Sequence, residues 1–183
     1  MQNVLQIKQD LLYKKKNIKN WIIFHDPFFE TLSIWRIKHE TFEKNIKITV
    51  HNTCTILGKV EVGENTWFGP YKALDGWKRG IKIGKNCSIS SCVNITDHYS
   101  VKWAFSGGMK KYEYGPVSIG HNCFVGTNAV ITKRVSIENH CLVESNALVT
   151  KCFPDYSIIF WVPGRHMGNV IVTEEDLILE YFD

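Results

Sequence analysis

The fold is decided by residues 119–149, IGHNCFVGTNAVITKRVSIENHCLVESNALV, in which a branched aliphatic residue returns at every sixth position. An α-helix turns by about 240° in six residues, so these positions would scatter over three of its faces and form no buried stripe. In an extended chain every sixth side chain points the same way. The period therefore excludes a helix and predicts a succession of short strands, each with one inward-facing anchor.

The same period occurs twice more upstream, in residues 50–74 and 83–95. The fourteen anchors are Val50, Ile56, Val62, Phe68, Leu74, Ile83, Ile89, Ile95, Ile119, Val125, Ile131, Ile137, Val143 and Val149. Glycine follows five anchors, at positions 63, 69, 84, 120 and 126, where it would permit a corner, and the fourth residue after an anchor is usually small. Three short faces would close a triangular prism whose coils stack about 4.8 Å apart. The period leaves the hand of the coil open, because right-handed crossovers are the general rule.

Two breaks interrupt the repeat. Three residues are inserted around 77–80, and the anchors are absent from 97 to 117. Loops as long as this second break are usually functional in compact domains, so we expect the chemistry there. Its mixture of aromatic and polar residues suits a sugar ring, and packing between subunits of a trimer is a compatible second role.

Several short motifs accompany the repeat. They are Trp67-Phe68-Gly69-Pro70 with Leu74-Asp75-Gly76, Cys87-Ser88-Ile89-Ser90, VKWAFSGG at 101–108, TKCFP at 150–154 and VPGR at 162–165. On these motifs, residues 46–170 resemble the hexapeptide-repeat acyltransferases, and among them the sugar O-acetyltransferases of surface-polysaccharide biosynthesis. The resemblance implies a left-handed prism, acetyl-CoA as cosubstrate, and a homotrimer with its active sites between subunits.

We therefore expect a mainly β protein built on a left-handed parallel β-helix of hexapeptide repeats over residues 46–170, with an inserted loop at 97–117. Apolar residues at helical spacing early in the chain predict a helical or irregular N-terminal cap over residues 1–45, which would cover open strand edges. Thr173 followed by three acidic residues predicts a short C-terminal helix within 171–183.

Acetyl transfer needs a base to take the proton of the acceptor, and an imidazole titrates near neutral pH. His98 lies where the repeat breaks, and the resemblance implies that it is the catalytic histidine. A histidine base needs a hydrogen-bond acceptor on its other nitrogen. Similar acetyltransferases carry an aspartate directly after the histidine, where Tyr99 stands here, so Asp97, Glu113 or a backbone carbonyl would have to serve.

The other histidines have simpler interpretations. His121 and His140 stand two and three residues after their anchors and are predicted to be turn residues, whereas His166, near the expected CoA segment, is a minor candidate for the base.

The remaining site residues follow from the loop and from the resemblance. Those expected to bind the acceptor are Asp97, Tyr99, Trp103, Ser106 and Glu113, and those expected to bind CoA are Phe124, Thr150, Lys151 and Arg165. Two residues depart from the resemblance, because relatives favour glycine where Glu144 and Trp161 stand. The bulk of Trp161 would narrow the adenine end of the CoA groove or stack on the adenine ring.

The first function expected is acetyl-CoA-dependent acetylation of a hydroxyl of a sugar or glycan precursor. N-acetylation of a nucleotide-linked amino sugar is the alternative, followed by a non-catalytic scaffold. A zinc lyase shares this prism, but it requires three converging histidines that include a pair five residues apart. Gly126 stands five residues after His121, so no metal site is expected.

Composition excludes several other classes. The net charge of +4 comes largely from an N-terminal lysine cluster, which is too weak to indicate nucleic-acid binding. No apolar run reaches the roughly 18 residues of a membrane span, so neither a transmembrane segment nor a signal peptide is expected. The six cysteines form no C-x-x-C pair, and we expect reduced, mostly buried thiols in a cytoplasmic protein.

Overall fold

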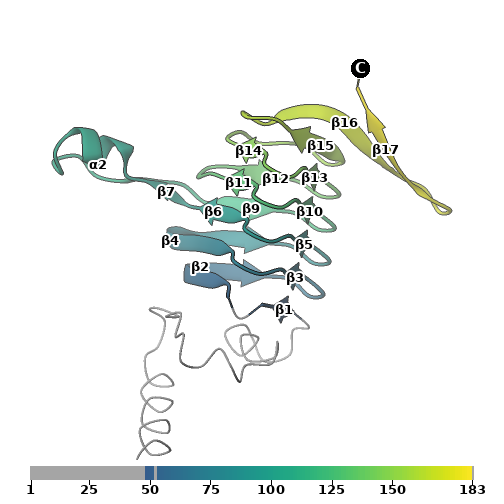
Figure 1. The fold of residues 1–183 in the computed structure, drawn as a ribbon, viewed down its shortest axis with the longest axis horizontal. Coiled ribbons are helices and arrows are strands. Elements are labelled where there is room, and N and C mark those ends of the chain that lie inside the picture. The colour runs from purple at the N-terminus through teal and green to yellow at the C-terminus, as the bar shows by residue number, and fades with distance from the viewer. Residues whose placement is uncertain (1–47, 52, 183) are drawn as a thin grey trace, which may run out of the picture.

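The computed structural model describes residues 48–51 and 53–182, and Figure 1 shows a column of short stacked strands. The elements are β1 (Thr49–Val50), β2 (Thr55–Val62), β3 (Trp67–Phe68), β4 (Ala73–Ile83), β5 (Ser88–Ile89), β6 (Asn94–Thr96), β7 (His98–Tyr99), α2 (Val101–Phe105), β8 (Glu113–Tyr114), β9 (Val117–Ile119), β10 (Phe124–Val125), β11 (Val130–Ile131), β12 (Ser136–Ile137), β13 (Leu142–Val143), β14 (Leu148–Val149), β15 (Ser157–Phe160), β16 (Arg165–Val172) and β17 (Leu177–Tyr181).

Parallel pairing between successive coils builds two long sheets. One has the order β1-β3-β5-β10-β13-β15-β16-β17, and the other has the order β12-β9-β4-β6-β11-β14 with β2 also on β4. The long strand β4 extends over two faces, because its first residues pair with β6 and its last residues pair with β9. The described chain is therefore mainly β and coils as a parallel β-helix, as the period predicted.

The anchors form the core. All fourteen are buried, and the most exposed of them, Val62, retains 8% of its accessible surface. The small residues four places later, such as Cys123 and Ala129, are also buried, at the corners between faces. All six cysteines are free, and four of them are buried.

Lys72 departs from this pattern, because it stands four residues after an anchor, where the residue is usually small. It is only 2% exposed. Its Nζ donates a hydrogen bond of 2.6 Å to the carbonyl of Gly69 and lies 5.5 Å from the centre of the Trp67 ring. Burial lowers the pKa of Lys72 to about 8.

The corners do not depend on the glycines that follow the anchors, so that expectation was wrong. Positive φ angles fall instead three residues after the anchors, at Asn122, Asn128, Arg134, His140 and Asn146 among others. Asparagine tolerates this left-handed conformation better than most residues. The glycines serve a different purpose: a Cβ atom at position 120 would lie 2.7 Å from the backbone of the next coil.

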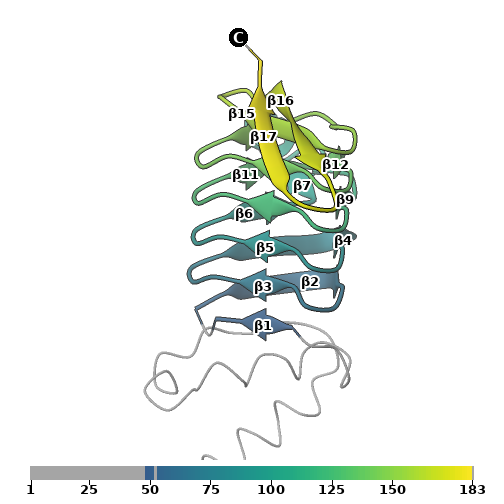
Figure 2. The ribbon, with the colours of Figure 1, turned by 90° about the vertical axis from the view of Figure 1, so that its right-hand side faces the viewer.

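The predicted C-terminal helix is also wrong. Residues 165–172 and 177–181 form the antiparallel hairpin β16–β17, which lies at the end of the column opposite β1 (Figure 2). Thr173 Oγ1 accepts the backbone N–H of Asp176 at 3.0 Å, a bond that resembles a helix cap. The chain continues as a strand because the edge of β16 offers backbone partners, and the β-branched Ile178 and the aromatic Tyr181 suit a strand.

The inserted segment 97–117, hereafter the arm, leaves the column through β7, bears α2 near its tip and returns through β8 (Figure 1). The predicted cap over residues 1–45 lies outside the described residues. Within the described part of the chain, no helix is long and apolar enough to cross a membrane.

Candidate active site

The site begins at the inserted residues 77–80. The pairing of β2 with β4 shifts register between Gly58 and Val60, so the inserted residues bulge out of β4. The backbone N–H groups of Lys78, Arg79 and Gly80 all donate to Asp97 Oδ2, at 2.9, 2.5 and 2.9 Å. The first break in the repeat therefore supplies a cradle of three donors for a carboxylate at the start of the second break.

Asp97 is fully buried and tied to three segments of the chain. Its backbone N–H donates to the carbonyl of Asp75, and its carbonyl accepts from Gly115, which closes the base of the arm. Burial opposes the charged form, but the three cradle N–H groups and His98 outweigh it, so the pKa of Asp97 lies below its ordinary value. Asp97 is thus held as a carboxylate.

His98 lies between two carboxylates. Its Nδ1 is 3.1 Å from Asp97 Oδ1, and its Nε2 is 3.9 Å from Asp75 Oδ2. Its ring stacks on Tyr112 of the arm, with 5.9 Å between ring centres, and lies 6.0 Å from the Tyr114 ring. With the proton of a neutral imidazole on Nδ1, facing Asp97, the lone pair lies on Nε2. This arrangement suits a general base.

Asp97 contacts His98 but cannot also contact an acceptor, because it has no exposed surface and both its oxygens already accept hydrogen bonds. The structure thus places Asp97 against His98, with no surface of its side chain open to the acceptor that it was expected to bind. Glu113, the other candidate partner of His98, pairs instead with Lys102 of α2 at 2.9 Å, which lowers the pKa of Glu113.

The other expected acceptor residues are spread along the arm. Tyr99 lies under Lys133, whose Nζ is 4.7 Å from the ring centre. Trp103 packs edge-on against Tyr112, at 5.8 Å between ring centres, and so connects with the rings around His98. Ser106 Oγ caps the end of α2 through bonds to Trp103 and Lys110.

Sequence reasoning missed Asp75. It belongs to the Leu74-Asp75-Gly76 motif, and its place directly after the anchor Leu74 puts it in register with Thr96, beside the start of the arm. Asp75 Oδ1 is buried and accepts no hydrogen bond from any described residue. Burial raises the pKa of Asp75, and His98 acts in the opposite direction. The Leu74-Asp75-Gly76 motif could have indicated Asp75 as a site residue, but the spacing of the motif does not indicate which side chain Asp75 faces.

The residues expected to bind CoA lie on different faces. Thr150 and Lys151 follow β14, which pairs through β11 with β6, so they lie two strands along the sheet from Asp97. That separation corresponds to about 10 Å at the usual strand spacing. Phe124, 43% exposed, belongs to the other long sheet, and Arg165 begins β16.

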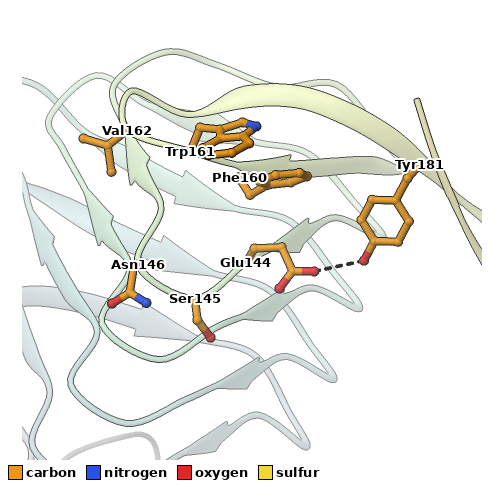
Figure 3. Close-up of a pocket in the computed structure, with 7 residues that line it drawn as sticks. All are labelled: Glu144, Ser145, Asn146, Phe160, Trp161, Val162 and Tyr181. Carbon is orange, nitrogen blue, oxygen red and sulfur yellow. Dashed lines mark hydrogen bonds between the residues drawn. The ribbon is translucent and has the colours of Figure 1, made fainter. Parts of the chain in front are cut away.

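A pocket of about 540 Å³ lies at the far end of the column and does not include His98. Its lining contains both residues that depart from the resemblance, Glu144 and Trp161 (Figure 3). Glu144 Oε1 accepts a hydrogen bond of 3.0 Å from the hydroxyl of Tyr181 in β17. The C-terminal hairpin therefore forms one wall of this pocket. The sequence pattern, which predicted a helix in this segment, did not predict such a wall.

The remaining histidines make local contacts. His121 Nδ1 accepts the backbone N–H of Lys85 at 2.9 Å. His140 occupies a corner and stacks on Tyr156, and His166 Nε2 lies 3.1 Å from Asn169 Oδ1. Within residues 48–51 and 53–182, no group of three or more His, Cys, Asp or Glu side chains is arranged to hold a metal ion.

Comparisons with known proteins agree with this architecture. A family model described as the hexapeptide repeat of succinyl-transferase matches residues 116–151. No curated protein matches the chain.

Among solved structures, the chain is similar to AntD, an N-acyltransferase from Bacillus cereus in complex with dTDP and 3-hydroxybutyryl-CoA. The sequence identity is 23% and the TM-score is 0.61, and the alignment covers 67% of this chain and 69% of AntD. It is also similar to a maltose O-acetyltransferase from Clostridium difficile 630, at 23% identity and a TM-score of 0.52, covering 76% and 68%. The chain thus contains a hexapeptide-repeat segment and shares its fold with acyltransferases.

Proposed function

We propose that the protein is an acetyl-CoA-dependent acetyltransferase that acts on a hydroxyl of a sugar or glycan precursor, with His98 as the general base. The observation that carries the proposal is the pairing of His98 with a buried carboxylate at the point where both interruptions of the repeat meet. A base fixed in one tautomer beside an aromatic arm suits proton abstraction from a polar acceptor.

In the proposed reaction, His98 takes up one proton and later gives the same proton away. When bound, acetyl-CoA would supply the thioester whose acetyl group moves to the acceptor oxygen. His98 Nε2 takes the proton of the acceptor hydroxyl as the oxygen bonds to the acetyl carbon, and the same nitrogen gives that proton to the departing sulfur. Asp97 remains ionised throughout and stabilises the imidazolium that exists between the two transfers.

For CoA, we propose contacts with Phe124, Thr150, Lys151 and Arg165. The fit rests on exposure and chemistry: Phe124 presents nearly half of its surface to a pantetheine arm, and Lys151 and Arg165 are exposed cations that suit phosphate groups. Thr150 and Lys151 also directly follow β14, a strand of the sheet that leads to Asp97. The solved relative AntD was crystallised with an acyl-CoA, which agrees with this assignment.

For the acceptor, we propose contacts with Tyr99, Trp103, Ser106 and Glu113 along the arm. Trp103 is 44% exposed and connects with the rings beside His98, so it offers an aromatic surface for a sugar ring.

An amine acceptor remains the alternative, because the solved relatives include both an N-acyltransferase and an O-acetyltransferase. We also propose a left-handed coil, a homotrimer in which a neighbouring wall completes each site, and a cytoplasmic location that suits free, mostly buried thiols. A monomer in light scattering would contradict the trimer.

The test is the release of free thiol from acetyl-CoA by the purified protein, against a panel of sugars, nucleotide sugars and amino sugars. His98→Ala should retain the fold and lose about a hundredfold or more in turnover. His121→Ala is the matched control, because the His121 ring accepts a hydrogen bond from the backbone of Lys85 in a turn distant from His98. Turnover of His98→Ala at the rate of wild type would refute the base. No thiol release with any acceptor, together with no binding of CoA, would favour the non-catalytic scaffold.

A further inference from the structure

Asp75 is a carboxylate of the site that the fold satisfies only in part: the backbone of Trp77 hydrogen-bonds to it, but one of its oxygens is left over. Among the described residues, its Oδ1 is the one buried side-chain oxygen or nitrogen without a hydrogen-bond partner. Carboxylates that serve only the fold are normally satisfied, as both oxygens of Asp97 are. The Asp75 side chain is 31% exposed, and its Oδ2 faces His98 Nε2 across 3.9 Å.

A gap of 3.9 Å is too long for a hydrogen bond between Asp75 and His98. The two atoms nevertheless face each other, and both side chains are partly exposed. In the proposed function, Nε2 carries the lone pair that takes the proton of the reacting hydroxyl. Two proton-accepting atoms therefore face one binding position, and the chemistry of the acceptor must satisfy both.

We propose that Asp75 positions the acceptor, its Oδ2 accepting a hydrogen bond from the hydroxyl next to the one that His98 deprotonates, so that the acceptor presents a vicinal diol. The proposal rests on the proposed function of His98 and adds to it the class of acceptor. A sugar ring with two adjacent free hydroxyls has this chemistry.

One hydroxyl alone does not fit, because its single proton goes to His98 and its lone pairs would then face the carboxylate. A second hydroxyl on the neighbouring carbon brings a second proton, which Asp75 can accept. A reacting amine is disfavoured, because a nearby carboxylate stabilises the ammonium form, which has no lone pair to attack the thioester.

The charges around Asp75 are compatible with this role. The ionisable groups that act on it are His98 and Asp97, and burial makes its own charged form costly. A donated hydrogen bond from the acceptor favours the ionised carboxylate and offsets that cost. The expected contribution of such a bond to a charged group corresponds to roughly tenfold or more in kcat/KM.

The test uses methyl glycosides of glucose, galactose and mannose, their monodeoxy counterparts and their monoamino counterparts. In wild type, removing the hydroxyl next to the acetylated position should lower kcat/KM about tenfold or more. In Asp75→Ala, the complete glycoside and its deoxy counterpart should react at the same low rate, because the partner of that hydroxyl is gone. Asp75→Asn keeps an accepting oxygen and should lose less than Asp75→Ala. Glu64→Gln, an exposed carboxylate paired with Lys85, is the control.

Three results would overturn the proposal. The first is a wild type whose kcat/KM does not change when the neighbouring hydroxyl is removed, and the second is an Asp75→Ala protein that loses as much kcat/KM on that removal as wild type does. The third is a preference for an amine at the reacting position. Binding of the same glycosides, followed by saturation-transfer NMR, separates this proposal from the proposed function. Binding that needs the diol and Asp75, without acetyl transfer, would support the diol site and refute the transferase. Failure of wild type to bind any glycoside with a vicinal diol would refute the diol site.

Discussion

Replacement of Asp97 by asparagine should leave the fold intact and remove most of the turnover. The three cradle N–H groups require an oxygen, so the amide oxygen of asparagine should take the place of Oδ2. Its NH2 group then takes the place of Oδ1, 3.1 Å from His98 Nδ1. Because an NH2 group donates, Nδ1 must accept, and the imidazole proton moves to Nε2. The lone pair required for general base catalysis is thereby lost.

The expected magnitude is a loss of about 10²- to 10⁴-fold in kcat, the range that general base catalysis supplies. Alanine at the same position would instead leave three N–H groups without an acceptor, at about 1–3 kcal/mol each. That sum approaches the whole free energy of unfolding of a typical domain, about 5–15 kcal/mol. Asparagine therefore separates catalysis from stability, and alanine does not.

The assay is thiol release at saturating acetyl-CoA, beside urea unfolding of the same preparations. Asp176→Asn is the matched control, because Asp176 lies in the exposed turn between β16 and β17. A folded Asp97→Asn protein with turnover near that of wild type would show that the tautomer argument is mistaken.

Three further predictions concern stability. Lys72 has a pKa of about 8 in the fold against 10.5 for an ordinary lysine, so the unfolded chain binds more protons than the folded chain between these two pH values. The free energy of unfolding should therefore rise with pH across this range, on the order of 3 kcal/mol relative to Lys72→Met, as measured by urea unfolding. Parallel pH profiles for the two proteins would contradict this. Gly120→Ala should cost about 1–3 kcal/mol, because the added Cβ would lie 2.7 Å from the next coil, and an unchanged melting temperature would argue against close approach there. Ile131→Ala, at a fully buried anchor, should lower the free energy of unfolding by about 2–5 kcal/mol. Phe105→Ala, at an exposed position of the arm, should change it by less than about 0.5 kcal/mol. Equal effects of the two substitutions would be inconsistent with the core described.

The core could be predicted because it repeats. An anchor such as Ile131 occupies one position of a local period, and the burial of every anchor follows from the geometry of an extended chain that coils. The breaks in that period also indicated where the unusual structure would lie, and both contribute to the cradle around Asp97.

The C-terminal segment and the glycines show where local signals fail. Thr173 makes the same type of hydrogen bond at the start of a helix and at a hairpin turn, so only the open edge of β16 decides between them. In the same way, the local sequence around Gly120 predicts a corner residue, and only the stacking of the next coil shows that the glycine permits close approach.

The sequence by itself determined the coiled β architecture, its buried anchors and the place of His98, because each depends on spacing along the chain. The tertiary structure decided which groups surround that histidine. Asp75 and the donors at 78–80 lie about twenty residues before the arm, and the stacking of coils brings them to opposite sides of the Asp97–His98 pair. Contacts of this kind depend on the register between coils, which no local period encodes.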